Sequence, residues 1–243
     1  MGALDGRTAL VTGGGRGLGA AIAASLAAHG AHVGVLARTA TEVRQVAASV
    51  GGTALVGDVA DPERLASVLQ RFGEVDIVVA NAGVVWPLGR FADVDVDEWE
   101  NAFRINVFGA VRVVRACVPG MVARGYGRIV TISSGAASPP GTPSANAYSA
   151  SKAALDMFTV HLARELDGTG VTANAVRPGV VDTEMQTFMR ARPVSQVGAQ
   201  FYERFHGLYD RGELLAPEES AAFVVDVALS DRNGDVLDIR TSR

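Results

Sequence analysis

The chain has 243 residues, a length that suits one large α/β domain or two small domains. Hydrophobic residues make up 48% of the sequence, which is enough for a buried core and excludes an intrinsically disordered protein. The formal net charge of −4 gives no electrostatic reason to expect nucleic acid or an anionic membrane as a partner.

The single cysteine, Cys117, excludes an internal disulfide and a metal site built from several cysteines, and we expect no metal. It lies in the apolar run 111–118, which predicts a buried, structural thiol. Charged residues interrupt the start of the chain, so no signal peptide is expected. The uncharged stretch 17–37 is long enough to span a bilayer, but it is alanine-rich and broken by glycine and histidine, which favours helix, turn and strand. We therefore expect a cytoplasmic protein.

The first predicted strand covers 8–11, and a glycine-rich loop separates it from a helix-forming run at 20–28. In this setting glycines let the backbone approach a pyrophosphate, and the N–H groups at the helix start favour its charge. The loop contains Gly13, Gly15, Arg16, Gly17, Leu18 and Gly19. The spacing alone is moderately specific, and a glycine-rich turn between packed elements is the alternative interpretation.

The second predicted strand, 31–37, is followed by Arg38 and not by an acid. A dinucleotide fold that prefers NAD usually places an acid about 20 residues after the glycine loop, where it binds the ribose hydroxyls. The nearest acid here is Glu42, in the next helix. Guanidinium groups suit a 2′-phosphate, so Arg16 and Arg38 favour NADP(H), with NAD(H) as the other possible cofactor. Two solvated surface arginines are the alternative.

The remaining chain continues the alternation of strands and helices. Helices are predicted over 41–49, 62–72, 97–118 and 147–167, and strands over 53–57, 75–80, 128–132, 171–177 and 235–239. Repeated βα units indicate a parallel sheet with helices on both faces. The sequence therefore predicts one α/β domain over 1–243, with a doubly wound, Rossmann-like sheet of seven mostly parallel strands. Pro119 near the end of the third of these helices predicts a kink.

Polar, charged or turn-forming residues follow the ends of six predicted strands. Because ligands of open parallel sheets bind outside the carboxyl ends of the strands, these residues predict one site along one edge. They are Gly13, Arg38, Asp58, Asn81, Ser134 and Pro178.

Tyr148 and Lys152 lie four residues apart in the predicted helix 147–167, so their side chains share one helix face. A fixed positive charge beside a phenol stabilises its anion and lowers its pKa, which suits proton exchange with a carbonyl or an alcohol. Lys152 is the only lysine among 22 basic residues. An ammonium differs from a guanidinium in shape and in the number of its donors. That the only lysine of the chain stands at this position therefore favours a specific role over an ordinary surface Tyr/Lys pair.

Together these motifs resemble the short-chain dehydrogenase/reductase family, in its short, single-domain form with a Tyr-x-x-x-Lys active site. The resemblance covers nearly the whole chain, and the ordered set is more specific than any single motif. It rests on the loop 12–19, Asp58-Val59, Asn81-Ala82-Gly83, Asn106, Ser134, Tyr148 with Lys152, and Pro178-Gly179 with Thr183.

The resemblance implies a role for each of four catalytic residues. Tyr148 is the implied acid/base, and Lys152 would lower its pKa and hold the nicotinamide ribose. Ser134 would bind the substrate oxygen, and Asn106 would hold a water in a proton relay. The neighbouring Ser133 competes with Ser134, which has the spacing to Tyr148 nearer the family's pattern.

The resemblance also implies a cofactor site made of the glycine loop, the strand ends and the catalytic helix. The implied residues are Gly13, Gly15, Arg16, Gly17, Leu18, Gly19, Arg38, Asp58, Val59, Asn81, Ala82, Gly83, Tyr148, Lys152, Pro178, Gly179, Val181 and Thr183. Ala80 departs from the family, which often has a second asparagine there.

The leading hypothesis is an NADP(H)-dependent carbonyl reductase or alcohol dehydrogenase that acts on a ketone or aldehyde, with Tyr148 as proton donor. A 3-oxoacyl thioester (acyl-carrier-protein) reductase is the alternative, because its substrate presents a similar carbonyl. A non-catalytic dinucleotide sensor fits less well, since all four acid/base candidates are present. An isomerase or dehydratase of this fold usually has a longer substrate domain.

The segment 184–212 lies where relatives have a mobile lid over the substrate. Its aromatic residues and methionines predict either an apolar pocket or simple packing of the lid on the core. Relatives pair through the helices that correspond to about 97–123 and 147–167, so we expect a homodimer or homotetramer. The tail after the last strand is shorter than in many relatives, which leaves the choice between them open.

Overall fold

Seven apolar runs of the sequence form strands, and these join into one sheet with the order β3-β2-β1-β4-β5-β6-β7 and all pairs parallel. The computed structural model describes residues 2–242. Its strands are β1 (Thr8–Thr12), β2 (His32–Ala37), β3 (Thr53–Val56), β4 (Ile77–Ala80), β5 (Gly127–Ile132), β6 (Val171–Arg177) and β7 (Val236–Asp238). The predicted seven-stranded, doubly wound sheet is confirmed.

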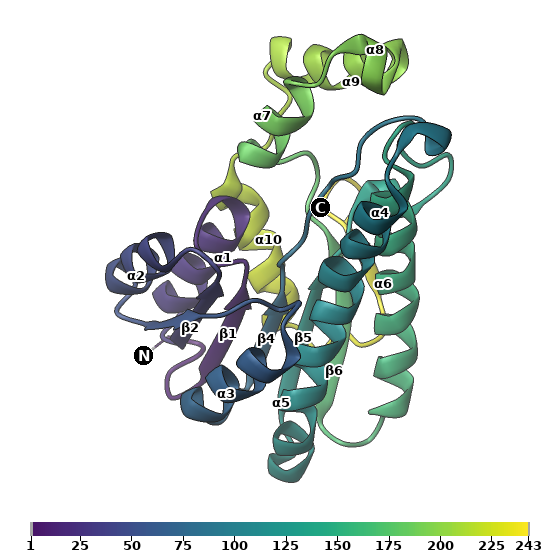
Figure 1. Cartoon of the computed structure of the whole chain (residues 1–243). Coiled ribbons are helices and arrows are strands. Elements are labelled where there is room, and N and C mark those ends of the chain that lie inside the picture. Colours follow the sequence, from purple (N-terminus) through teal and green to yellow (C-terminus); the bar gives the residue numbers. More distant parts are fainter. Residues whose placement is uncertain (1, 243) are drawn as a thin grey trace.

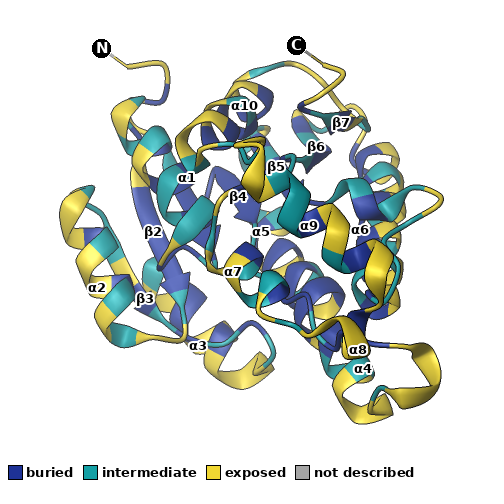
Figure 2. Cartoon of the chain, turned by 90° about the horizontal axis from the view of Figure 1, so that it is seen from above, coloured by how far each residue is buried: buried dark blue, intermediate teal, exposed yellow. Residues whose placement is uncertain are grey.

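Helices cover both faces of this sheet, as the apolar character of its strands requires (Figures 1 and 2). One face packs on α1 (Gly17–Ala28), α2 (Ala40–Ser49) and α10 (Pro217–Leu229). The other face packs on α3 (Pro62–Phe72), α5 (Ala110–Arg124) and α6 (Asn146–Glu165). The two apolar clusters between these layers form the core.

The helix predicted over 97–118 is longer than expected and has three parts. They are α4 (Val96–Phe103), a π-helical segment (Arg104–Gly109) and α5, which runs past Pro119 and ends at Gly125 with φ of 65°. A glycine in this left-handed conformation closes a helix, whereas the proline removes only one backbone donor. The predicted end was therefore too early. By length and composition Val96–Arg124 is apolar enough to cross a membrane, and 44% of that apolar window is buried in the fold.

Cys117 lies on the buried side of α5 and is a free thiol. Burial raises its pKa to about 12, an effect that the nearby charge of Arg124 reduces only in part. A thiol with so high a pKa is not a nucleophile near neutral pH. The predicted buried thiol is confirmed.

The segment after β6 folds into three short helices at one end of the molecule (Figure 1). They are α7 (Glu184–Arg190), α8 (Val194–Val197) and α9 (Ala199–Asp210). A third apolar cluster joins them to the loops after β4 and β5, with Phe201 and Phe205 at its centre. Short 3₁₀ turns at Phe91–Asp93 and Gly135–Ala137 complete the secondary structure.

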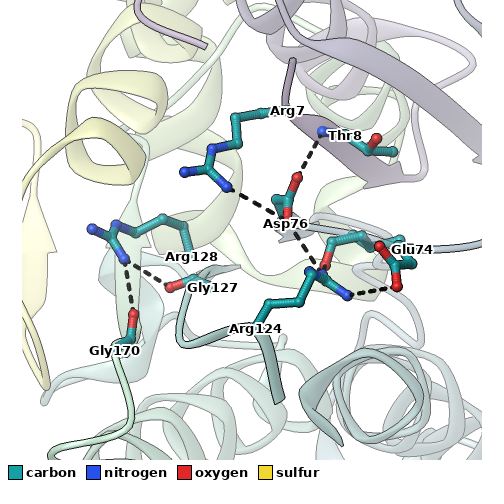
Figure 3. A network of polar contacts seen from close by, with 9 residues as sticks. Arg7, Thr8, Glu74, Asp76, Arg124, Gly127, Arg128 and Gly170 are labelled. Carbon is teal, nitrogen blue, oxygen red and sulfur yellow. Dashed lines mark hydrogen bonds and ion pairs between the residues drawn. The ribbon is translucent and has the colours of Figure 1, made fainter. Parts of the chain in front are cut away.

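Charged side chains connect the chain at the opposite edge of the sheet, where the strands begin (Figure 3). The Asp76 carboxylate accepts hydrogen bonds from the Thr8 backbone N–H at 3.1 Å and from Arg124 Nη2 at 3.2 Å. Arg7 approaches the same carboxylate at 3.9 Å, and Arg124 also pairs with Glu74 at 3.5 Å. Asp76 thus ties β1, β4 and α5 together, away from the strand ends that carry the predicted site.

Asp76→Asn is expected to lower the free energy of unfolding by about 2 kcal/mol, because it removes a mostly buried charge from two arginines and a backbone donor. For a domain of this size that loss corresponds to a melting temperature lower by about 4–8 °C. Glu74→Gln is the matched control, since the Glu74 side chain is 79% exposed and surface pairs contribute little. Equal melting temperatures for the two variants would show that Asp76 has no such role.

Candidate functional site

A cavity of about 530 Å³ lies at the carboxyl ends of the strands, around the point where the strand order reverses between β1 and β4. The six residues predicted from the strand ends all line it. So does every predicted cofactor-binding residue: Gly13, Gly15, Arg16, Gly17, Leu18, Gly19, Arg38, Asp58, Val59, Asn81, Ala82, Gly83, Tyr148, Lys152, Pro178, Gly179, Val181 and Thr183. The topology therefore gathers the predicted site along one edge.

The glycine loop between β1 and α1 has the properties of an anion cradle. Gly13 has φ of 64°, and a Cβ there would lie 2.9 Å from the Ala82 Cα, so only glycine fits. No side chain caps the start of α1, and its first turn contains no acid. By contrast, Asp61 caps α3. The first N–H groups of α1 therefore suit the pyrophosphate of a dinucleotide.

Asn81 and Thr12 fasten the loop to the sheet. The Asn81 side-chain amide donates to the carbonyls of Thr12 and Gly13, at 2.9 and 3.2 Å. The Thr12 hydroxyl accepts from the backbone N–H groups of Asn81 and Ala82, at 3.1 and 3.0 Å. These four bonds hold the ends of β1 and β4 in register at the floor of the cavity. The expected strand contact of Asn81 is thus present.

The two arginines expected at a 2′-phosphate are already paired with carboxylates. Arg16 Nη1 lies 3.6 Å from a Glu42 carboxylate oxygen and also contacts Glu184. Arg38 Nη1 lies 3.9 Å from Asp58 Oδ2. Both arginines line the cavity, so the expected position at a cofactor site is met, but each is paired with a carboxylate. A 2′-phosphate would have to share or replace these carboxylates.

Tyr148 and Ser134 form the polar centre of the cavity. The hydroxyl of Ser134 hydrogen-bonds that of Tyr148 and also accepts from the Ala136 N–H at 3.1 Å. The neighbouring Ser133 hydroxyl is buried without a partner among residues 2–242. Burial raises the pKa of Tyr148 above its ordinary value of 10, and the bond to Ser134 offsets this only in part. The structure therefore pairs Ser134, and not Ser133, with the tyrosine.

Lys152 is buried one helical turn after Tyr148, with 3% of its surface exposed. Its Nζ donates to the Ile132 carbonyl at 2.6 Å and lies 5.8 Å from the centre of the Tyr148 ring. Burial lowers the pKa of Lys152 to about 8, partly offset by Asp156. In this structure burial raises the pKa of Tyr148, and the Lys152 ammonium is hydrogen-bonded to the carbonyl at the end of β5. A role of Lys152 in lowering that pKa stays a prediction.

Comparison with known proteins shows to which family the chain belongs. The family model described as short chain dehydrogenase matches residues 7–193. The chain belongs to the short-chain dehydrogenase/reductase family. Versicolorin reductase 1 of Aspergillus parasiticus is 41% identical over 192 residues, covering 75% of this chain and 72% of that protein.

Two further short-chain dehydrogenases/reductases match a larger share of the chain. The 3-oxoacyl-[acyl-carrier-protein] reductase FabG of Escherichia coli is 36% identical over 229 residues, covering 89% of this chain and 92% of that protein. The crystal structure of the KRED1-Pglu enzyme superposes with a TM-score of 0.88 and 33% identity, over 95% of this chain and 99% of that one. The chain is therefore an oxidoreductase of a family that binds nicotinamide dinucleotides.

Asn106 is the one expected catalytic residue of this family member that does not line the cavity. It is fully buried in the π-helical segment, and its amide exchanges hydrogen bonds with the backbone of Val84, at 2.7 and 2.9 Å. A further bond of 2.9 Å joins it to the Ser151 hydroxyl. The side chain thus holds the loop after β4 against the catalytic helix. A water-binding role for Asn106 stays a prediction.

The segment 184–212 supplies both packing and lining residues. Met185, Phe188, Met189 and Phe205 line the cavity, whereas Phe201 does not and is buried in the third apolar cluster. Tyr202 also lies outside the lining; its ring stacks on His206 at 3.9 Å. Each of the two interpretations therefore holds for some of these residues.

The cavity is also lined by residues that the sequence patterns did not indicate, and Glu42, Trp86, Arg204 and Arg240 are among them. Arg240 follows β7 closely, so the strand-end rule that indicated the other six positions applies to it too. Trp86 and Arg204 lie in a loop and in α9, where no sequence pattern marks them. Among residues 2–242, no group of three or more His, Cys, Asp or Glu side chains is arranged to hold a metal ion.

Proposed function

We propose that this protein is an NADP(H)-dependent carbonyl reductase or alcohol dehydrogenase that acts on a ketone or aldehyde, with Tyr148 as proton donor. The observation that carries the proposal is the hydrogen-bonded pair of Tyr148 and Ser134, which lines the same cavity as the glycine loop. A dinucleotide on that loop and a carbonyl at the hydroxyl pair would share one space. The nicotinamide, when bound, supplies the hydride.

The residues of the chain supply the proton and the orientation. Since burial holds the pKa of Tyr148 above 10, the phenol keeps at neutral pH the proton that reduction consumes. Ser134 hydrogen-bonds the phenol and would bind the same substrate oxygen. With a pKa of about 8, Lys152 is mostly charged at pH 7 and places a cation behind the tyrosine. We expect kcat/KM for reduction to fall as the pH rises through about 8.

A 3-oxoacyl thioester reductase is the alternative substrate assignment. It is supported by the likeness to the Escherichia coli 3-oxoacyl-[acyl-carrier-protein] reductase, which extends over most of both chains. Measuring NADPH oxidation with a panel of ketones, aldehydes and 3-oxoacyl thioesters tests both assignments. Turnover of thioesters alone would favour the alternative. A folded protein that binds NADPH, but for which no compound of the panel leads to NADPH oxidation, would favour a dinucleotide sensor.

The preference for NADP(H) is supported by Arg38 and Arg16 in the cavity and by the absence of an acid directly after β2. Arg38→Asp is expected to shift the ratio of NADPH to NADH affinity by about tenfold toward NADH, since a charge-assisted contact is lost. Glu42→Gln is expected to strengthen NADPH binding about threefold, because Arg16 loses a competing carboxylate. Dissociation constants of NADPH and NADH, measured by fluorescence titration, check the predictions for the two variants. Equal affinity of the unmodified protein for the two cofactors would contradict the preference.

We also propose a homo-oligomer assembled through α5 and α6. Phe108 in the π-helical segment is 54% exposed and Met157 in α6 is 60% exposed, and large apolar groups at such positions favour an interface. Phe108→Glu or Met157→Glu is expected to shift the protein toward monomer in light scattering. Val194→Glu, on the exposed side of α8, is the control and should change nothing. An unmodified protein that is monomeric at micromolar concentration would contradict the proposal.

A further inference from the structure

The part of the cavity wall outside the glycine loop and strand ends is mostly apolar. Trp86, Met185, Phe188, Met189 and Phe205 form much of it. Among the described residues, the carboxylates that line the cavity are Glu42, Asp58 and Glu184, and each is paired with Arg16 or Arg38 on the side of the glycine loop. The apolar wall therefore contributes no acid.

The Arg240 guanidinium lies beside the loop after β5 that contains Ser134 and Gly135. Its Nε and Nη2 donate to the two Asp238 carboxylate oxygens at 2.9 and 2.6 Å, which sets the orientation of the guanidinium. A Cβ on Gly135, the residue after Ser134, would lie 2.9 Å from Arg240 Nη2. The guanidinium therefore packs against the loop that carries Ser134, and it lines the cavity.

Arg204 contributes a second positive charge from α9. Its guanidinium carbon lies 5.5 Å from the centre of the ring of Phe205, which also lines the cavity. Within residues 2–242 no carboxylate pairs with Arg204, whereas Arg16, Arg38 and Arg240 all have one. Arg204 is thus an unneutralised cation at an apolar wall.

We propose that the substrate is an amphiphilic anion, a carbonyl compound with an apolar body and a carboxylate or phosphate group that Arg204 binds. An apolar wall suits the body, and a guanidinium without a partner favours an anionic oxygen group over a neutral one. The inference rests on the proposed carbonyl reduction and adds the substrate's charge to it.

The test compares substrates that differ only in charge. 6-Oxo-6-phenylhexanoate is compared with its methyl ester, and S-acetoacetyl-4′-phosphopantetheine with S-acetoacetylpantetheine. In at least one pair the anionic member should have a KM about three- to tenfold lower. The pair that shows the preference identifies carboxylate or phosphate as the source. Arg204→Gln should remove the preference by raising the KM of the anionic member.

Arg211→Gln is the matched control, because Arg211 follows the end of α9, does not line the cavity and pairs with Glu213. It should keep the preference. Equal KM values within both pairs, or a preference that survives Arg204→Gln, would overturn the inference while leaving carbonyl reduction intact.

A binding measurement separates this inference from the proposed activity. Calorimetric titration compares 4-phenylbutanoate, which has no ketone to reduce, with 4-phenylbutanamide. Tighter binding of the carboxylate, lost in Arg204→Gln and kept in Arg211→Gln, supports the anion site even if no substrate is turned over. Equal binding of the two compounds counts against it, whatever the activity.

Discussion

Tyr148→Phe is expected to lower kcat for carbonyl reduction by about 10²–10⁴-fold, because it removes the phenol beside Ser134 that is proposed to give the substrate its proton. The ring stays, so packing in the third apolar cluster is kept. NADPH affinity should change little, since the glycine loop and Lys152 are untouched. Steady-state kinetics measure kcat, and a fluorescence titration on the same preparation measures the affinity for NADPH.

Ser134→Ala is the companion variant. It removes the hydrogen bond that partly offsets the raised pKa of Tyr148, so turnover should fall. Ser133→Ala serves as its control, because the Ser133 hydroxyl has no partner among the described residues. A Tyr148→Phe protein with normal turnover would show that another group donates the proton.

Lys152→Arg is expected to abolish turnover although it keeps the positive charge. Lys152 is buried and its Nζ donates to the Ile132 carbonyl at 2.6 Å, a contact that the larger, planar guanidinium cannot repeat from the same position. We expect weaker cofactor binding as well. In addition, any residual activity should lose the fall in rate near pH 8, because an arginine does not titrate there.

The control for Lys152→Arg is Lys152→Met, which removes the charge and avoids the larger head group. Thermal melting of both variants shows whether the fold survives. If Lys152→Arg is folded and turns over normally, the role of the lone lysine as a shaped donor is refuted. If Lys152→Met retains the loss of rate near pH 8, that titration belongs to another group.

The fold was largely predictable because its signals are local. Each strand is a short apolar run, and each run ends at a residue that differs in character, such as Gly13, Asn81 or Pro178. Parallel topology then places those ends together without further information. The extension of α5 past Pro119 was missed because packing against the sheet outweighs the loss of one backbone donor.

Every residue predicted for the cofactor site lines the cavity, but the electrostatic state of these residues was not predictable from the sequence. The sequence shows Tyr148 and Lys152 four residues apart, yet the direction of the tyrosine's pKa shift depends on burial and on the hydrogen bond with Ser134, which only the fold reveals. Likewise, Arg16 and Glu42 are distant in sequence and meet because the β1–α1 loop packs on α2. Arg240 lies two residues after the end of β7, at the same edge of the sheet as the other strand-end residues.

The most direct test of the account is transfer of label from NADPH that carries deuterium at the reactive position of its nicotinamide. With a ketone, aldehyde or 3-oxoacyl thioester from the panel, mass spectrometry of the product should find deuterium on the former carbonyl carbon. At saturating NADPH, Tyr148→Phe should form about 10²–10⁴-fold less of this deuterated product in the same time. A folded, NADPH-saturated unmodified protein that transfers no deuterium to any carbonyl compound of the panel would contradict carbonyl reduction as the activity of this site.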